Sequence, residues 1–310
     1  MNIIFMGTPD FAVGALEAIL KAGHKVQLVV TQPDKAQGRS KELKPPAVKV
    51  CALEHGLPVF QPERIKKEEA VAVLKQYDAD IYVVAAFGQI LSKEILDLPK
   101  FGCVNIHASL LPKYRGAAPI QWSIIEGEKV TGVTTMFMAD GVDTGDMLEK
   151  IEVEIAEDET GGSLHDKLME AGAKLIVTTL QKLEAGSITR TVQDDALSTH
   201  TKKLEKSLGD IDFTKSAVEI ERLIRGLNPW PSAYTRYNGK TLKVWKAEVL
   251  DKEYDGEPGQ IVDKTKKSIV VKTGKGALAI TELQMEGKKR MTTESYMCGA
   301  SIDEGIILGE

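Results

Sequence analysis

Short, almost wholly apolar segments alternate with amphipathic segments over the first 185 residues, and this alternation restricts the fold of the chain more than any other feature. The apolar segments are rich in β-branched residues, which is typical of strands. We predict strands at 3–6, 26–31, 81–86, 103–107 and 130–138 and helices at 9–21, 46–55, 63–76 and 119–126. Strands without a polar face belong in a parallel sheet that helices cover on both sides. The sequence therefore predicts an α/β fold with a mostly parallel, Rossmann-like sheet.

A long amphipathic helix is expected to end this region. Apolar residues recur at 3.6-residue spacing from Leu164 to Leu183 and form one stripe. Ser163 and Asp166 resemble a capping box, and Gly186 is a natural stop. We therefore predict that this helix starts at Ser163.

The pattern changes after residue 189. Residues 190–209 are polar and predict a linker, and a helix is expected at 213–227, before two prolines. Short strands with glycine-containing turns follow, which is typical of a small closed β-barrel. We expect Trp230 and Trp245 in its core. The predicted organisation is a catalytic domain at 1–189, a linker at 190–209 and a second domain at 210–310.

Composition excludes a membrane-spanning or disulfide-rich protein. No apolar run approaches the ~18 residues that a membrane-spanning helix needs, and the first residues do not resemble a signal peptide. Cys51, Cys103 and Cys298 form no Cys-x-x-Cys motif and predict free thiols in a reducing compartment. We expect a cytoplasmic protein that acts as a monomer without a membrane.

The distribution of charge distinguishes the two ends of the chain. The net charge is −5, but residues 201–310 hold 19 Lys and Arg against 17 Asp and Glu. The C-terminal third is therefore the part better suited to a polyanion. Because this excess of positive charge is small, the clustering of the charges matters more for polyanion binding than their sum.

The segment 102–116 carries the clearest chemistry. Side chains alternate along a strand, so Asn105 and His107 should share one face near the carboxyl end of a strand, where parallel sheets bind ligands. An amide can donate to an oxyanion, and an imidazole can exchange a proton near neutral pH. An isolated Asn-x-His is more often a capped strand end and a half-buried histidine, so the motif alone is weak.

A second polar segment, 139–146, follows the last predicted strand of the sheet. Its carboxylates do not have the spacing of an EF-hand, and the five histidines of the chain show no ligand spacing, so we expect no metal. The segment is compatible with a solvated turn. Alternatively, one of its Asp residues pairs with His107 and fixes the orientation of the ring.

Together these segments resemble the signature of folate-dependent formyltransferases: Asn105-Ile-His107, then Ser109-Leu-Leu-Pro112-x-Tyr-Arg-Gly116, then Asp143-Thr-Gly-Asp146. The resemblance implies that Asn105, His107 and Asp143 are catalytic. It implies 10-formyltetrahydrofolate as the formyl donor, with no metal and no nicotinamide. The residues that it implies for folate binding are Ser109, Leu110, Leu111, Pro112, Gly88, Gln89, Ile90 and Leu91.

Members of this family differ in the amine that they formylate. Segments 5–12, 32–46 and 225–234 are similar to the branch that acts on initiator methionyl-tRNA and has an OB-like C-terminal domain. This resemblance implies that residues 210–310 bind tRNA. The basic segment 33–46 is also longer than the 2–6 residues that usually join a strand to a helix. The tRNA contacts that we predict are Arg39, Lys41, Lys44, Lys203 and Lys206.

The sequence fits three other functions less well. A formyltransferase acting on a nucleotide-linked sugar amine has the same two domains but does not need the basic segment. A nicotinamide-dependent dehydrogenase needs Gly-x-Gly-x-x-Gly after the first strand, where this chain has Gly7-Thr8-Pro9-Asp10-Phe11-Ala12. A tRNA-binding protein without catalytic activity would leave Asn105, His107 and Asp143 without a role.

Overall fold

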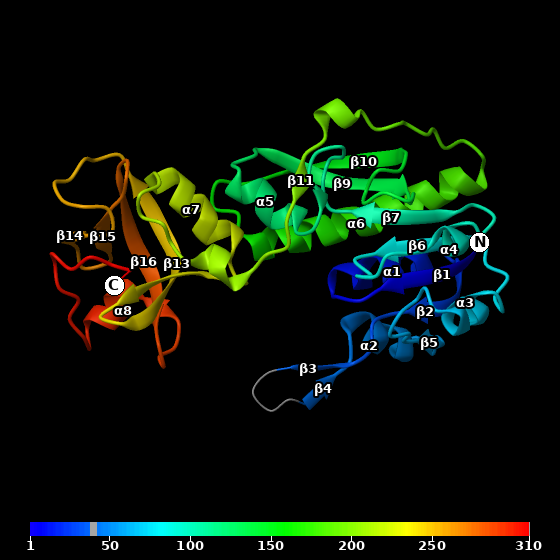
Figure 1. The fold of residues 1–310 in the computed structure, drawn as a ribbon, viewed down its shortest axis with the longest axis horizontal. Helices are drawn as coiled ribbons and strands as arrows, with labels where there is room; N and C mark the ends of the chain where they lie inside the picture. The colour runs from blue at the N-terminus through cyan, green and yellow to red at the C-terminus, as the bar shows by residue number, and fades with distance from the viewer. Residues whose placement is uncertain (38–41, 310) are drawn as a thin grey trace. The chain divides into compact units, whose positions relative to one another are not determined.

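The computed structural model describes residues 1–37 and 42–309. They form two compact units, each assembled from separate stretches of the chain. Unit 1 contains residues 1–116, 130–154 and 165–201, and unit 2 contains 117–129, 155–164 and 202–310. Unit 1 is an α/β structure and unit 2 contains an antiparallel sheet, so the predicted fold class is confirmed (Figure 1).

A seven-stranded sheet forms the centre of unit 1, in the order β10-β9-β7-β6-β1-β2-β5. The five strands from β7 to β5 are parallel, whereas β9 and β10 are antiparallel to their neighbours. Strand β10 was not predicted, because its alternating charged residues look like a solvated segment. The strands are β1 (Asn2–Gly7), β2 (Lys25–Val30), β5 (Val59–Phe60), β6 (Ile81–Ala85), β7 (Cys103–His107), β9 (Val130–Phe137) and β10 (Met147–Glu154).

Helices cover both faces of this sheet. Side chains from β1, β2 and β6 form one apolar cluster with residues of α3 and α4. On the other face, α6 packs against β7 and β9, where Gly172 lies close to Ile106 and Val133. The helices of unit 1 are α1 (Phe11–Lys21), α2 (Ala47–Glu54), α3 (Glu68–Leu74), α4 (Lys93–Leu96) and most of α6 (Gly161–Glu184).

Helix α6 begins earlier than predicted. It starts at Gly161, not at Ser163. The hydroxyl of Thr160 accepts a hydrogen bond from the Ser163 amide at 3.1 Å, which is the usual contact of a helix-capping side chain three residues away. Ser163 is therefore inside the first turn, and Thr160 caps the helix.

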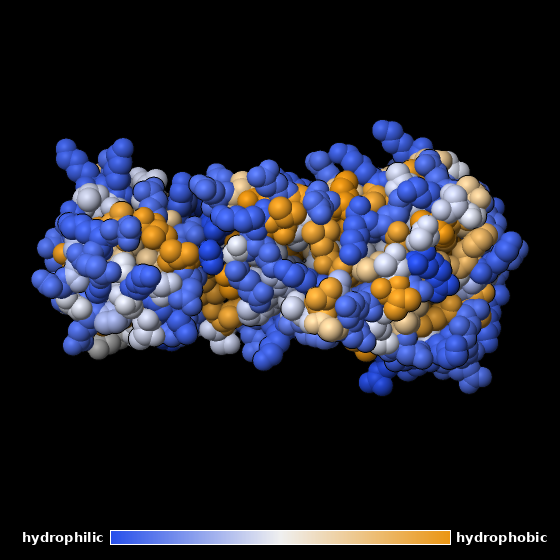
Figure 2. Space-filling view, turned by 90° about the horizontal axis from the view of Figure 1, so that it is seen from above, coloured by the Kyte–Doolittle hydropathy of each residue, from blue (hydrophilic) through white to orange (hydrophobic). Residues whose placement is uncertain are grey.

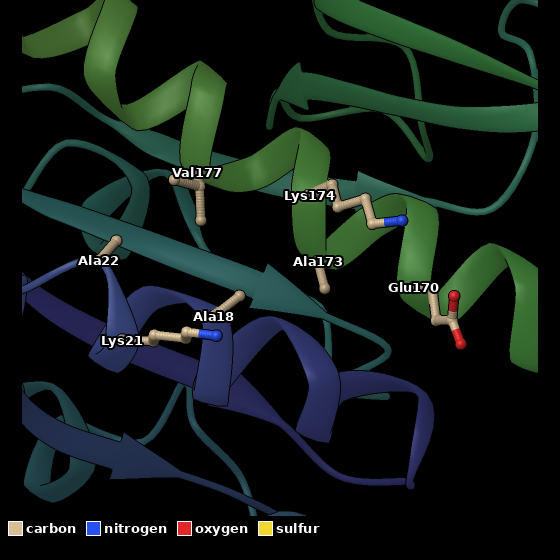
Figure 3. Close-up of a pocket in the computed structure, with 7 residues that line it drawn as sticks. All are labelled: Ala18, Lys21, Ala22, Glu170, Ala173, Lys174 and Val177. Atoms are coloured by element: carbon tan, nitrogen blue, oxygen red, sulfur yellow. The ribbon is translucent and has the colours of Figure 1, made fainter.

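Helices α1 and α6 lie side by side along one groove (Figure 3). Small residues line it, with Ala18 and Ala22 from the α1 side facing Ala173 and Val177 of α6. Gly14 lets the helices approach, since a β-carbon there would lie 3.1 Å from Met169. The groove has a volume of about 540 Å³.

Two short strand pairs and a 3₁₀ helix belong to unit 1 besides the sheet. Strands β3 (Lys35–Gln37) and β4 (Glu42–Lys44) pair as an antiparallel ribbon in the basic segment. Strand β8 (Arg115–Gly116) pairs in parallel with β11 (His200–Thr201), and the 3₁₀ helix η1 (Asp195–Leu197) precedes β11. Part of the polar stretch 190–209 therefore packs with unit 1.

Unit 2 is built around an antiparallel sheet in the order β12-β13-β16-β15-β14, with β17 beside β16. Helix α7 packs on it through Ala217, Ile220 and Ile224. A capping box between Ser216 and Glu219 places the start of α7 at Ala217. The elements are α5 (Pro119–Ile125), η2 (Lys206–Gly209), α7 (Ala217–Gly226), β12 (Ala233–Tyr237), β13 (Lys240–Leu250), β14 (Ile261–Lys264), β15 (Ile269–Lys272), β16 (Ala277–Met285), β17 (Met291–Thr292) and α8 (Thr293–Met297).

The expectation that two tryptophans lie in the core of this domain is wrong. Trp230 is 56% exposed, because it stands between the two prolines that end the segment after α7. Trp245 is half-buried, and its ring contacts Lys243 and Arg290, whose cationic groups lie 5.6 and 4.7 Å from the ring centroid. The ring of Trp245 therefore packs against two cationic side chains and not against the apolar core.

Hydrophilic residues make up much of the face shown in Figure 2. Among the described residues, no helix is both long enough and apolar enough to cross a bilayer.

Gly132 in β9 provides a test of the β9–β10 pairing. A β-carbon there would lie 2.1 Å from the Ile151 carbonyl oxygen and 2.6 Å from Leu110. We expect Gly132→Ala to lower the free energy of unfolding by about 1–3 kcal/mol, measured in urea by circular dichroism, because overpacking shifts the backbone. Gly299→Ala is the matched control, since its β-carbon would meet no atom within 4 Å. Equal stability of both variants would contradict this pairing.

Candidate active site

The side chains of β7 alternate between the two faces of the sheet. Ile106 packs beneath α6, so Asn105 and His107 lie on the opposite face. Asn105 pairs in register with Val84 of β6 and Met136 of β9, and His107 pairs with Thr134. His107 is buried, whereas Asn105 is half-buried and its amide has no hydrogen-bond partner among residues 1–37 and 42–309. That amide is available to a ligand.

The imidazole of His107 faces one acceptor on each side. Its Nδ1 lies 3.5 Å from Oδ2 of Asp143, and its Nε2 lies 2.9 Å from the carbonyl oxygen of Tyr114. A neutral ring can donate from only one nitrogen, whereas the doubly protonated ring donates to both. The two contacts therefore fix the plane of the ring.

The loop between β9 and β10 brings the carboxylate of Asp143 to this ring. Asp143 has a left-handed backbone, with φ of 53°, and its Oδ2 accepts a hydrogen bond of 2.8 Å from the amide of Gly116. Its other oxygen, Oδ1, has no partner within the described part of the chain. The structure thus brings Asp143 against His107, and Asn105 lies on the same face of β7 two residues before His107.

Gln193 and Arg115 hold this loop in place. The amide nitrogen of Gln193 donates to the carbonyl oxygens of Asp143 and Gly145, both at 2.8 Å. Its Oε1 accepts a hydrogen bond of 2.9 Å from Nε of buried Arg115, which also forms an ion pair with Asp195. Sequence reasoning missed Gln193, because it lies in a polar stretch with no periodic pattern.

The predicted folate segment 109–112 has a fixed backbone. The Thr134 hydroxyl donates to the Ser109 carbonyl and accepts from the Leu111 amide, at 2.7 and 3.1 Å. Leu111 is buried in a small apolar cluster, whereas Leu110 and Pro112 are partly exposed. The exposed side chains therefore project from a rigid turn beside His107.

The second predicted folate segment, 88–91, follows the end of β6, the strand beside β7. Gly88 has a φ of 81° and lies against Gln32, so a β-carbon there would meet Gln32 at 2.3 Å. Gln89 supports the turn, since it accepts from the Ile65 amide at 2.7 Å. Ile90 is 67% exposed and Leu91 is buried, so Gly88 and Ile90 offer the accessible surface of this segment.

The base of the basic segment is tied to unit 1. Asp34 accepts hydrogen bonds from Lys49 and Gln61, and these partners hold the pKa of its carboxyl below the usual value, with the Gln61 bond as the largest cause and the Lys49 bond next. Strands β3 and β4 thus form an antiparallel ribbon that follows an anchored base. Lys44 is exposed at its end, whereas Arg39 and Lys41 lie outside the described residues. Lys203 and Lys206 are exposed in unit 2.

Comparison with known proteins agrees with this architecture. Residues 1–180 match the family model of formyl transferases, and residues 203–301 match the model of their C-terminal domain. An N-formyltransferase from Helicobacter canadensis, solved with folinic acid and dTDP-3-aminofucose, has a TM-score of 0.65 at 20% identity and covers 93% of this chain and 99% of its own. The chain belongs to the formyl transferase family, which confirms the predicted resemblance.

Relatives of higher identity define the branch. The methionyl-tRNA formyltransferase of Agathobacter rectalis is 59% identical over 98% of both chains, and that of Lachnospira eligens is 53% identical over 100% of both. Within its family, the chain therefore belongs with the methionyl-tRNA formyltransferases.

Gln193 provides the test of this site. We expect Gln193→Leu to lower kcat for formyl transfer by roughly 10²-fold, because the Asp143 loop loses its support and a displacement of about 1 Å in a reacting group has a cost of this order. The fold, followed by circular dichroism, should persist. Val192→Ala is the control, because the side chain of Val192 is next to Gln193 in the sequence and is 77% exposed. A Gln193→Leu variant with full turnover would show that the loop needs no such support.

Proposed function

We propose that this protein transfers the formyl group of 10-formyltetrahydrofolate to the amino group of initiator methionyl-tRNA. The observation that carries the proposal is the contact of Asp143 with His107, with Asn105 on the same face of β7. An unpartnered amide, a ring with acceptors at both nitrogens and a carboxylate with one free oxygen are the groups that acyl transfer to an amine requires.

The reaction follows from the positions of these groups. The neutral amine of methionine attacks the formyl carbon, and the amide of Asn105 donates to the oxygen that becomes negative. The charge of His107 stabilises the same oxyanion, and the Asp143 carboxylate keeps the ring oriented. The attacking nitrogen loses a proton to Oδ1 of Asp143, directly or through water. As the oxyanion collapses to the carbonyl, the bond between the formyl carbon and folate N10 breaks, and N10 takes the proton from Oδ1 of Asp143.

The donor is proposed to bind along the ends of β6 and β7. The rigid turn at 109–112 and the segment at 88–91 follow these neighbouring strands, and both present exposed side chains next to buried ones. A flat, partly apolar ring system suits such a surface. The chemistry requires neither a metal nor a nicotinamide, because the formyl group is already activated.

The acceptor is proposed to bind through phosphate contacts in both units. Lys44, Lys203 and Lys206 are exposed, and within the described residues none of the three forms an ion pair. Their charges are therefore available to phosphates, which supply affinity without reading sequence. Arg39 and Lys41 belong to the same proposal. In this scheme residues 1–189 transfer the formyl group with support from residues 190–201 of unit 1, residues 202–209 link, and residues 210–310 bind tRNA.

The protein is further proposed to act as a cytoplasmic monomer. All three residues of the site come from one chain, so a second copy is not needed to complete it. Cys51, Cys103 and Cys298 are free thiols, as expected in a reducing compartment.

The acceptor is identified by offering the protein 10-formyltetrahydrofolate together with initiator methionyl-tRNA, a nucleotide-linked sugar amine or water alone. We expect formyl on methionyl-tRNA. In the same assay His107→Ala should lower kcat by about 10²–10⁴-fold, the usual contribution of an acid or base, and remain folded. His200→Ala is the matched control, because that side chain is exposed. Transfer to the sugar amine only would overturn the assigned acceptor, and full turnover by His107→Ala would overturn the mechanism.

The phosphate contacts are tested by salt dependence. We expect the double variant Lys203→Ala/Lys206→Ala to raise KM for tRNA and to reduce the slope of log KM against log salt by about 1 per lost contact, with KM for the folate unchanged. Lys266→Ala/Lys267→Ala removes the same charge from another exposed position of unit 2 and is the control. Equal effects of both double variants would mean that the net charge of the unit, not these two lysines, sets the affinity.

A further inference from the structure

Helices α1 and α2 bring three metal-ligating side chains together on a surface remote in sequence from the residues of the proposed reaction. Cys51 and His55 are four residues apart on α2 and its C-terminal cap, so they project from the same face of that helix. Glu17 comes from α1, which packs against α2. Each of the three side chains offers one ligand atom: a sulfur, a nitrogen or an oxygen. These three atoms all lie within 4.8 Å of one another.

The spacing suits a small cation. Zinc binds thiolate sulfur at about 2.3 Å and nitrogen or oxygen at about 2.0 Å in a tetrahedron, which places neighbouring ligand atoms roughly 3.5 Å apart. Glu17 and His55 are exposed, so their side chains have room to rotate toward this tighter spacing. A thiolate and a carboxylate also balance the double positive charge of the ion.

The three side chains are not engaged elsewhere. Within residues 1–37 and 42–309, no hydrogen bond or ion pair involves the carboxylate of Glu17, the thiol of Cys51 or the imidazole of His55. A hollow of about 410 Å³ lies beside them, lined by Glu17, Leu20, Lys21 and His55. It gives room for a water molecule as the fourth ligand, as in three-ligand zinc sites.

We propose that Glu17, Cys51 and His55 bind one Zn²⁺ ion, which ties α1 to α2. A set of one sulfur, one imidazole and one carboxylate favours zinc over magnesium or calcium, which prefer oxygen ligands. Because α2 directly follows the β3–β4 ribbon, the ion stabilises the helix that carries the anchor residue Lys49. This site is independent of the proposed formyl transfer.

The test titrates zinc into the untagged, metal-free, full-length protein and measures the heat of binding. We expect one ion per chain. With Co²⁺ in place of zinc, we expect thiolate-to-metal absorption in the near ultraviolet, and Cys51→Ala should abolish this band. His55→Ala and Glu17→Gln should each weaken zinc binding by at least about tenfold. Loss of a residue that only supports a ligand already weakens metal binding by about this factor, and loss of the ligand itself should cost no less. Cys298→Ser and His200→Ala are matched controls at exposed positions and should bind zinc normally.

A second measurement separates binding at this site from adventitious binding. Zinc in excess should raise the Tm of the wild-type protein, because an ion that binds only the folded state stabilises it. In the absence of zinc, the His55→Ala variant should have the same Tm as the wild-type protein. Added zinc should not raise the Tm of the variant. The proposal is overturned if zinc does not bind, if His55→Ala and Glu17→Gln bind it as tightly as the wild type, or if Cys298→Ser abolishes binding.

Discussion

The hydrogen bonds that fix the loop of Asp143 are the constraint on which the site depends. The loop between β9 and β10 has no regular structure of its own, and Asp143 within it has a left-handed backbone. Two contacts of 2.8 Å from Gln193 and one from the Gly116 amide hold the carboxylate against His107. Because Gln193 is itself bonded to buried Arg115, the loop, the segment after β7 and the stretch after α6 form one polar framework.

The sequence predicts the sheet well and the framework poorly, for a physical reason. Parallel strands are buried on both faces and leave continuous apolar runs, so β7 was predicted to the residue. Strand β10 carries alternating charges at the edge of the sheet and leaves no such run. Helix α6 was found by its apolar stripe, but its start was misplaced because Thr160, not Ser163, provides the cap.

The proposed catalytic residues and the residues that support them differ in the same way. Asn105, His107 and Asp143 were proposed because motif resemblance links them across the chain, and alternation along β7 places the first two on one face. The contacts of Gln193, Thr134 and Tyr114 depend on tertiary structure alone. All five tRNA contacts, Arg39, Lys41, Lys44, Lys203 and Lys206, stay predictions from resemblance and charge. The Glu17, Cys51 and His55 cluster also escapes a survey of histidine spacing, since its third member lies on another helix.

The position of Gln193 has a consequence for dissecting this enzyme. The family model of the N-terminal region ends at residue 180, yet the side chain that supports the Asp143 loop comes 13 residues later. Thr199 also accepts a hydrogen bond from the Tyr114 amide. A fragment cut at the end of the family match would keep every motif of the chemistry and lose the scaffold that aligns it, so a self-sufficient N-terminal half has to extend through β11.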